Sequence, residues 1–419
     1  IQVKNNKPII VIGGGMAGIT AAVEAAEAGV SVILLESLPY LGGNAIAMNR
    51  YFPKMCPPYC GMEINFRRIK DNPLIRFFVS TKLTAIEQMD AGFKVILESS
   101  PEYVNDNCTL CGDCSAVCPV EQADAFNQFM SKKKAIDHPH DLAYPEKYYL
   151  DESFCIKAEC SKCMEACSYN AIDLKAESQT NEFEVQSIIL ATGWQSFDPI
   201  AMPEYSFGNH PDILTSLMME RMSAPNGPTA GKIRCQAGDC PPETIAFIQC
   251  AGSRDEKHLP YCSGVCCSAS LKQALHAVEV LPDVEVSIHY IDLRVTGRNE
   301  DFLRKAENHP RIKLIKGKVT KVNSDDGTSL KLTAEHIDSG KKITSSANLV
   351  VLATGVIPNK NPVVDLLPEN RSFMNPTSLP KGIYLAGSAL QAMDVSSSVK
   401  SATAAVLLGV SDSQIPNNE

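Results

Sequence analysis

The sequence predicts an α/β protein with two related parallel-sheet domains, the first of which is interrupted by a cysteine-rich α+β segment. Three observations support this fold class. A glycine-rich turn follows the first apolar segment, an apolar strand ending in Ala-Thr-Gly occurs twice (187–193 and 350–355), and two cysteine runs divide the first half. At 419 residues the chain has the length for two or three domains with buried cores.

Composition and charge exclude several classes of protein. The formal net charge is −9, whereas a nucleic-acid-binding protein needs a basic face to neutralise phosphates. No apolar stretch approaches the length of about 18 residues expected of a membrane-spanning helix. The first residues lack a charged-then-apolar leader, so we expect a cytoplasmic protein. In a reducing compartment, sixteen cysteines favour metal binding or redox chemistry over disulfides.

The amino-terminal segment matches a dinucleotide-binding βαβ unit. A strand at 9–12 is followed by a glycine turn, an alanine-rich helix and a second strand that ends at Glu36. In this motif, Gly13 permits the tight turn, Gly15 lets the backbone approach a pyrophosphate, and Gly18 lets the helix pack closely. Amides at the helix start favour phosphate, and the acid about 20 residues later can accept hydrogen bonds from ribose hydroxyls. The residues predicted to bind the nucleotide are Gly13, Gly15, Ala17, Gly18 and Glu36.

Three further segments indicate that the nucleotide is FAD. The segments SLPYLGGNA, SIILATG and GIYLAGS resemble parts of flavoproteins that have two dinucleotide-binding domains. That resemblance implies that the Ala-Thr-Gly turn passes the flavin and that the last strand ends near the ribityl chain. Ser388 stands there in place of the usual aspartate, and the helix beginning near Val395 would direct its amides towards the isoalloxazine. The residues implied are Gly42, Gly43, Ala191, Thr192, Gly193, Gly387, Ser388 and Val395.

The cysteine-rich insert has the spacing of a bacterial ferredoxin. A Cys-x2-Cys-x2-Cys-x3-Cys-Pro run begins at Cys108, and a Cys-x4-Cys-x2-Cys-x3-Cys run begins at Cys155. In two-cluster ferredoxins the fourth cysteine of a run binds the other cluster. The sequence therefore predicts two [4Fe–4S] clusters, one on Cys108, Cys111, Cys114 and Cys167 and the other on Cys155, Cys160, Cys163 and Cys118. Structural zinc is the alternative for either set, because four thiolates also suit that metal.

The second half repeats the first, but its phosphate-binding glycines are replaced by cysteines. A strand at 244–250, a helix over 268–281 and a strand at 284–291 preserve the βαβ frame. The positive end of a helix favours a thiolate-bound cluster much as it favours a phosphate. We therefore expect a third iron–sulfur cluster where a relative would bind a nicotinamide nucleotide. Its candidate ligands are Cys250, Cys262, Cys266 and Cys267, of which the adjacent pair need not both be ligands.

The segments FIQCAGSRD and YCSGVCC resemble the flavin-containing component of heterodisulfide reductase and its relatives (HdrA-like proteins). Within that group, segment 52–73 and the insert are most similar to the A-type flavin subunit of the quinone-interacting membrane-bound oxidoreductase (Qmo) complex. The resemblance covers essentially the whole chain and implies that the third cluster lies close to FAD. For Cys56 and Cys60 two roles stay open, a cluster ligand or a redox-active dithiol. Cys235 and Cys240 match no pattern and are expected to be ordinary loop cysteines.

These assignments divide the chain into five segments. A Rossmann-like FAD domain is expected at 1–97, 183–230 and 361–419, and 183–230 also contains the linker. The ferredoxin-like insert is expected at 98–182, and the related, cysteine-bearing second domain at 231–360.

The resemblance implies an electron-transfer oxidoreductase subunit with FAD and iron–sulfur clusters. In a Qmo-type complex it would relay electrons between the menaquinone pool and adenylylsulfate reductase, with flavin-based bifurcation or confurcation as one mode. The implied partners are a second HdrA-like flavin/iron–sulfur subunit and a haem-bearing membrane subunit, which would hold the protein at the inner face of the cell membrane. The alternatives are an NAD(P)H-dependent flavin oxidoreductase that feeds ferredoxin-type clusters, an HdrA-like component of a sulfur-oxidising thiol/disulfide system, and a non-catalytic scaffold.

Overall fold

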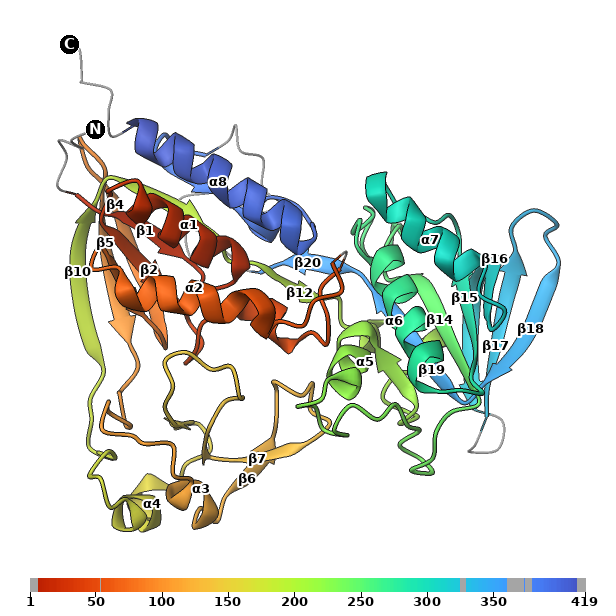
Figure 1. Cartoon of the computed structure of the whole chain (residues 1–419), viewed down its shortest axis with the longest axis horizontal. Helices are drawn as coiled ribbons and strands as arrows, with labels where there is room; N and C mark the ends of the chain where they lie inside the picture. The colour runs from red at the N-terminus through yellow and green to blue at the C-terminus, as the bar shows by residue number, and fades with distance from the viewer. Residues whose placement is uncertain (1–6, 53, 325–328, 360–372, 374–378, 413–419) are drawn as a thin grey trace. The chain divides into compact units, whose positions relative to one another are not determined.

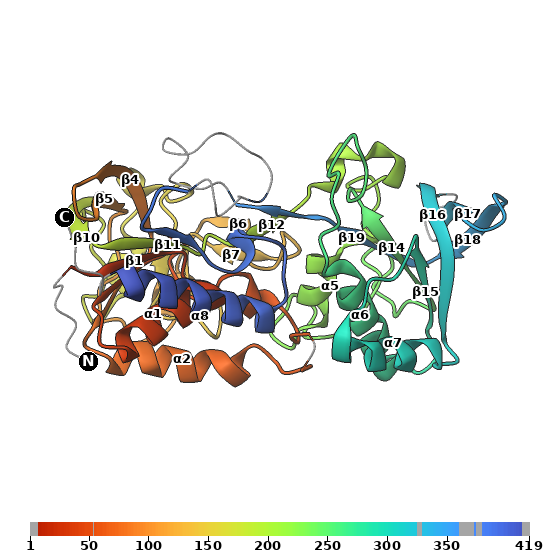
Figure 2. The same cartoon turned by 90° about the horizontal axis from the view of Figure 1, so that it is seen from above.

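A computed structural model describes residues 7–52, 54–324, 329–359, 373 and 379–412. The chain forms two compact units, whose elements are labelled in Figures 1 and 2. The first unit comprises Ile1–Ile46, Pro58–Trp194 and Pro358–Glu419, and the second comprises Ala47–Pro57 and Gln195–Ile357. Segment 195–230, expected with the FAD domain, is therefore part of the second unit.

A parallel five-stranded sheet forms the centre of the first unit. Its strands are short and almost entirely apolar, which suits a sheet covered on both faces. Their order is β21-β11-β1-β2-β3. Their bounds are Ile9–Ile12 (β1), Val32–Leu35 (β2), Ile75–Phe78 (β3), Ser187–Leu190 (β11) and Ile383–Leu385 (β21). Because they are parallel, their carboxyl ends lie at the same edge of the sheet.

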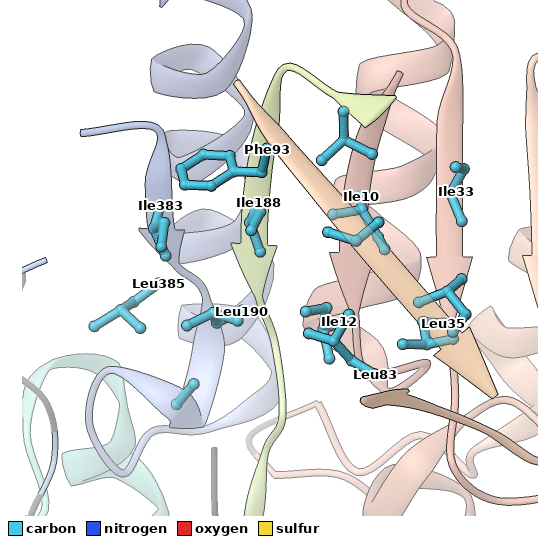
Figure 3. Close-up of a cluster of buried hydrophobic side chains, with 14 residues drawn as sticks. Ile10, Ile12, Ile33, Leu35, Leu83, Phe93, Ile188, Leu190, Ile383 and Leu385 are labelled. Atoms are coloured by element: carbon cyan, nitrogen blue, oxygen red, sulfur yellow. The ribbon is translucent and has the colours of Figure 1, made fainter. Parts of the chain in front are cut away.

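An antiparallel layer covers one face of this sheet. It consists of β4 (Thr81–Gln88), β5 (Phe93–Ser99) and β10 (Gln179–Val185). Alternate side chains of the two layers, including Ile10, Leu35 and Phe93, interlock in a buried core (Figure 3). Helices α1 (Met16–Glu27), α2 (Tyr59–Asp71) and α8 (Val395–Asp412) lie on the opposite face, where α1 contacts both of the others (Figures 1 and 2).

The cysteine-rich segment is inserted between two paired strands. Ser99, at the end of β5, pairs with Gln179, at the start of β10, so the chain leaves and re-enters the unit at one place. Its elements are α3 (Asp113–Ala116), β6 (Glu121–Ala123), β7 (Lys132–Lys134), β8 (Ile136–Asp137), β9 (Tyr149–Leu150), η2 (Lys157–Glu159) and α4 (Lys162–Ala166). A small core of its own includes Cys114 and Cys163. This arrangement is consistent with an insert, and its ferredoxin-like nature stays a prediction.

The second unit repeats the topology of the first, as the sequence predicts. Five strands are paired in parallel, and β16 continues into an antiparallel meander, in the order β13-β19-β14-β15-β16-β17-β18. The strands are β13 (Ile213–Thr215), β14 (Thr244–Ala251), β15 (Glu285–Tyr290), β16 (Ile312–Ser324), β17 (Leu330–His336), β18 (Lys342–Ala347) and β19 (Leu349–Thr354). The helices are α5 (Ser216–Ser223), α6 (Cys266–Val280), η5 (Gly297–Asn299) and α7 (Glu300–Glu307). The single strand β16 takes the place of β3 and β4.

The remaining elements are short. Strands β12 (Trp194–Ser196) and β20 (Val356–Pro358) pair with each other. The 3-10 helices are η1 (Gly43–Ala47), η3 (Pro199–Ala201), η4 (Pro203–Tyr205) and η8 (Gly387–Ala389). In the described part of the chain, no helix combines the length and apolar character needed to cross a bilayer.

Candidate functional site

The predicted FAD residues come from the ends of four parallel strands in the first unit. The glycine turn follows β1, Glu36 follows β2, the Ala-Thr-Gly turn follows β11, and Gly387 and Ser388 come just after β21. Ligands of open α/β sheets bind at this carboxyl edge. The fold therefore brings together residues that are up to 375 positions apart in the sequence, between Gly13 and Ser388.

Two glycines of the motif, one in the turn and one in α1, are required by close backbone approach. Gly13 has a φ of 111°, and a Cβ there would lie 2.3 Å from the carbonyl oxygen of Ala191. A Cβ at Gly18 would lie 1.7 Å from the carbonyl oxygen of Gly13. Either substitution would force the helix away from the strand ends. The motif thus packs α1 onto β1 and β11.

The Gly42-Gly43 pair lies against the glycine turn. The Gly42 amide donates to the carbonyl of Gly14 at 2.7 Å, and a Cβ on Gly43 would lie 2.8 Å from the Cα of Gly15. These contacts hold the segment after Glu36 beside the phosphate-binding position.

The Glu36 carboxylate is buried at the end of β2 and is held in place by its own chain. It accepts hydrogen bonds from the Gly14 amide at 2.7 Å, the Leu38 amide at 2.8 Å and the Ser37 hydroxyl at 3.1 Å. A carboxylate has about four acceptor positions, so one remains for a ribose hydroxyl. Gly15 is the N-cap of α1 and offers no side-chain cap, which leaves the first amides of the helix for an anion. The site therefore fits a dinucleotide.

Two polar residues that the sequence analysis missed order the turn after β11 and the start of α8, the two segments predicted to face the flavin. Asn359 donates from its side chain to the Thr192 carbonyl at 2.7 Å and from its backbone to the Gly193 carbonyl at 3.2 Å. Asp394 accepts the Ser397 amide at 2.7 Å and so caps the start of α8. An aspartate just before a helix is a recognisable capping signal, whereas the Asn359 contact depends on the tertiary fold.

The position after β21 is also closely packed. Gly387 has a φ of 61°, and a Cβ there would lie 2.6 Å from the Cβ of Ala17 on α1. Ser388 is buried beside it, and Val395 is the first residue of α8. These predicted residues thus gather where β21, α1 and α8 meet.

The first predicted cysteine set surrounds a single cavity. The cavity has a volume of about 320 Å³, open solvent included, and its lining contains all four predicted ligands of the first cluster. These are Cys108, Cys111, Cys114 and Cys167. Burial raises the pKa of the Cys114 thiol to about 12, so metal coordination would have to displace its proton. Tyr148 and Tyr169, which sequence reasoning missed, line the same cavity.

The second predicted set is also brought together. Burial raises the pKa of Cys163, and the neighbouring thiols of Cys155, Cys118 and Cys160 raise it further. Cys118 therefore lies with the second run, although it ends the first. Helices α3 and α4, which carry part of each run, contact each other and lie side by side in Figure 1.

Structural zinc stays the alternative to a four-iron cluster for either cysteine set. Among the described residues, no three histidine, cysteine, aspartate or glutamate side chains converge on one metal-ion position. Four sulfurs on one zinc stand about 3.8 Å apart, from a Zn–S bond of about 2.3 Å. In a four-iron cluster each thiolate binds its own iron, so the sulfurs spread around a larger body. For a four-iron cluster, the feature to look for is therefore a set of cysteines that line one cavity.

The cysteines of the second unit gather where β14 meets α6. Cys250 interrupts the pairing of β14 with β19 and has a φ of 57°, a conformation rarely adopted by residues other than glycine. Cys266 and Cys267 begin α6, which has no side-chain cap. Burial raises the pKa of Cys250, the neighbouring Cys267 raises it further, and Arg254 opposes both. The adjacent pair thus lies at the positive end of a helix, as predicted.

Backbone amides point at several of these sulfurs. Ala171 donates to Cys167 at 3.3 Å, Gly264 to Cys262 at 3.4 Å, and Arg294 to Cys267 at 3.5 Å. Hydrogen bonds to the sulfurs are one of the factors that set cluster potentials. These amides would therefore act on the potential of any cluster that the predicted ligands bind.

Cys56 and Cys60 belong to different units. Cys60 is exposed on α2 of the first unit. Cys56 lies in the second unit, in a short hairpin whose Tyr51 amide donates to the Cys56 carbonyl at 2.7 Å. Their redox or ligand roles stay predictions.

A buried ion pair fixes the segment Ala47–Pro57, which contains Cys56, within the second unit. Lys272 and Glu220 are 2.5 Å apart, and both side chains are nearly inaccessible to solvent. Lys272 also donates to the Arg50 carbonyl at 2.8 Å, and Glu220 accepts the Asn49 amide at 3.0 Å. The sequence gives no signal for this pair, because its members lie on α6 and α5.

The fold and the nucleotide site define a flavin-dependent oxidoreductase of the type with two dinucleotide-binding domains. Residues 8–67 match the family model described as FAD dependent oxidoreductase. Thioredoxin reductases from Lactococcus lactis and T. acidophilum share the fold, with TM-scores of 0.53 and 0.55. They are 14% identical to this chain, cover 97% and 98% of it, and are themselves covered to 99%. At this identity the likeness concerns the fold alone.

Within that class, the chain is a homologue of the HdrA component of heterodisulfide reductases. It is 34% identical to HdrA of the Ferredoxin/F(420)H(2)-dependent CoB-CoM heterodisulfide reductase of Methanosarcina acetivorans, over 96% of this chain and 52% of that protein. It is 32% identical to HdrA of the H(2):CoB-CoM heterodisulfide,ferredoxin reductase of Methanothermobacter marburgensis, over 94% and 62%. A heterodisulfide reductase iron-sulfur subunit from Methanopyrus kandleri is 34% identical over 97% and 64%. The chain thus spans about half to two thirds of the curated relatives it matches.

Proposed function

We propose that the chain is the FAD and iron–sulfur electron-transfer subunit of a Qmo-type complex. It would relay electrons between the menaquinone pool, through partner subunits, and adenylylsulfate reductase. The observation that carries this proposal is the cavity lined by Cys108, Cys111, Cys114 and Cys167, because cysteines from two separate runs converge there. Homology to HdrA of the heterodisulfide reductases supports the same class of function.

The residues of the first unit would hold FAD in a fixed orientation. The Glu36 carboxylate would accept a hydrogen bond from a ribose hydroxyl, and the amides at the start of α1 would bind the pyrophosphate. Asn359 keeps the Ala-Thr-Gly turn ordered beside the flavin position. Bound FAD supplies the exchange between two-electron and one-electron transfer.

The proposed partners are adenylylsulfate reductase, a haem-bearing membrane subunit and a second HdrA-like flavin/iron–sulfur subunit. The chain would be cytoplasmic and would reach the inner face of the membrane through a partner. Flavin-based bifurcation or confurcation is one mode in which the bound flavin would divide or combine electrons.

Cofactor analysis of anaerobically purified protein tests the proposal. Three [4Fe–4S] clusters require about twelve irons and twelve sulfides per FAD, with cluster signals in the EPR spectrum of the reduced protein. About eight irons would leave the cysteines of the second unit without a cluster. Protein without flavin absorbance and with only trace iron would instead support a scaffold.

An NAD(P)H-dependent flavin oxidoreductase is the second candidate, since the second unit keeps the frame of a nucleotide-binding domain. Its turn carries Cys250 in a left-handed conformation in place of the phosphate-binding glycines, which disfavours nicotinamide binding. Rapid bleaching of the flavin absorbance by NADH alone, measured by stopped flow, would favour the NAD(P)H-dependent oxidoreductase over the electron-transfer subunit.

A component of a sulfur-oxidising thiol/disulfide system is the third candidate. In that system Cys56 and Cys60 would carry the thiol chemistry. Serine at both positions without loss of activity on a thiol substrate would count against it.

A further inference from the structure

Cys235 and Cys240 lie close together in the loop that precedes β14. The Cys235 amide donates to the Cys240 carbonyl at 2.8 Å, and the Cys240 thiol is near enough to contribute to the raised pKa of Cys235. Both thiols are free. This backbone hydrogen bond brings the two residues together across a four-residue loop, and a disulfide requires such a close approach of the two chain positions. The sequence predicts ordinary loop cysteines here, and the fold instead makes them a pair.

The rest of the loop holds this pair in place. Asp212, buried at the start of β13, accepts the Gln236 amide at 2.5 Å and the Ala237 amide at 3.4 Å. Arg234 and Asp239, each of which directly precedes one of the two cysteines, form an ion pair. The loop is therefore ordered by contacts that do not involve either sulfur.

The two thiols differ in their access to solvent. Cys240 is exposed, whereas Cys235 is only 6% exposed and its sulfur lies 3.8 Å from the Asn348 carbonyl. Burial raises the pKa of Cys235 to about 12. An external reagent can therefore reach Cys240 first, with Cys235 behind it. An accessible cysteine beside a second, resolving cysteine is the arrangement found in redox-sensing pairs.

We propose that Cys235 and Cys240 form a thiol–disulfide exchange site for low-molecular-weight disulfides. The Cys240 thiolate attacks one sulfur of R–S–S–R, the external S–S bond breaks, and the first RSH leaves with the Cys240 proton. Cys235 then attacks the Cys240 sulfur of the mixed disulfide, and the second RSH leaves with the Cys235 proton. One intramolecular disulfide forms, and two electrons pass from the protein dithiol to the external disulfide.

This site is separate from the proposed electron-transfer centres. The loop lies at the amino ends of β14 and β19, where the Thr244 amide donates to the Asn348 side chain at 3.0 Å. Cys250 lies near the opposite end of β14. The exchange site therefore does not depend on the presence of any cluster or flavin.

The test incubates anaerobic holoprotein with a series of oxidised-to-reduced glutathione ratios, followed by acid quenching, alkylation and peptide mass spectrometry. We expect the peptide 235–254 to become lighter by two hydrogen atoms, with Cys235 and Cys240 both protected from alkylation. A cysteine peptide added to the same mixtures serves as the reference thiol and should gain glutathione at the same ratios. Fragment ions distinguish the bond from one made by Cys250 in the same peptide.

Two variants separate the steps. Cys235→Ala should leave Cys240 trapped as a stable mixed disulfide with glutathione, and Cys240→Ser should leave Cys235 reduced and unmodified. Unchanged flavin and visible absorbance would show that each variant is folded. The proposal is overturned if the reference peptide gains glutathione while both loop thiols stay reduced in the native protein. It is also overturned if the native protein accumulates the mixed disulfide, or joins either loop thiol to Cys250.

Discussion

Replacing Cys167 by alanine tests the crossed assignment of the cluster ligands. Cys167 ends the second cysteine run, yet it lines the cavity formed by Cys108, Cys111 and Cys114 of the first run. If the assignment is right, the Cys167→Ala variant loses the first cluster and keeps the second. One of three four-iron clusters is then lost, and the iron content falls from about twelve to about eight per FAD.

Double variants turn this expectation into a test of which cysteines act together. Cys111 and Cys160 suit this purpose because each belongs to one run and neither is part of the buried core. Cys111→Ala combined with Cys167→Ala should still retain about eight irons, because both changes remove the same cluster. Cys160→Ala combined with Cys167→Ala should retain only about four.

Iron and sulfide analysis, with EPR of the reduced proteins, measures these contents. Cys240→Ala is the matched control, since it removes an exposed cysteine from the second unit and should leave about twelve irons. The reasoning is refuted if the two double variants exchange their iron contents, because Cys167 would then belong to the set of its own run.

Three further predictions concern the flavin site and the cores. Glu36→Gln should weaken FAD binding about 5- to 150-fold in flavin titrations. The new side-chain amide would place a donor against the Gly14 backbone amide, which costs about 1–3 kcal/mol. The control Glu27→Gln, at a surface ion pair, should change FAD binding little. Gly387→Ala should destabilise the fold to denaturant by about 1–3 kcal/mol more than Gly29→Ala, because only at Gly387 would the new methyl meet another, at 2.6 Å. Burial lowers the pKa of His289 from 6.5 to about 4. As the pH falls, the imidazole is therefore protonated in the unfolded chain before it is protonated in the folded protein. The free energy of unfolding should then fall by about 2 kcal/mol between pH 7 and pH 5. An equal fall in His289→Phe would contradict that cause.

Much of the nucleotide site follows from short-range sequence signals. The spacing of Gly13, Gly15 and Gly18 predicts the motif because all three glycines lie in one turn and the helix that follows it. Parallel strands place their carboxyl ends at one edge, so the same logic predicts that Glu36 and Gly387 meet them. In the described structure, a helix follows the glycine turn, and the strands before Glu36 and Gly387 run parallel to β1 or β11.

Other parts of the molecule depend on contacts between distant segments. Asn359 supports the turn at Thr192 across 167 positions, and Lys272 pairs with Glu220 on another helix. The inclusion of Ala47–Pro57 in the second unit has no compositional signal either. Such features arise only once the tertiary fold brings the partners together, so motif spacing cannot reveal them.

Cysteine spacing is informative where a short loop would itself surround the bound group, as predicted between Cys108 and Cys114. Cysteine spacing gives no signal at Cys235 and Cys240, because Asp212, which directly precedes β13, orders their loop. Cys250 shows a third case, in which the backbone carries the information. A left-handed conformation costs a residue with a side chain about 1–3 kcal/mol and persists only where the surroundings impose it. Glycine would adopt this conformation without that cost, so the surroundings of Cys250 must hold its backbone in place at the end of β14.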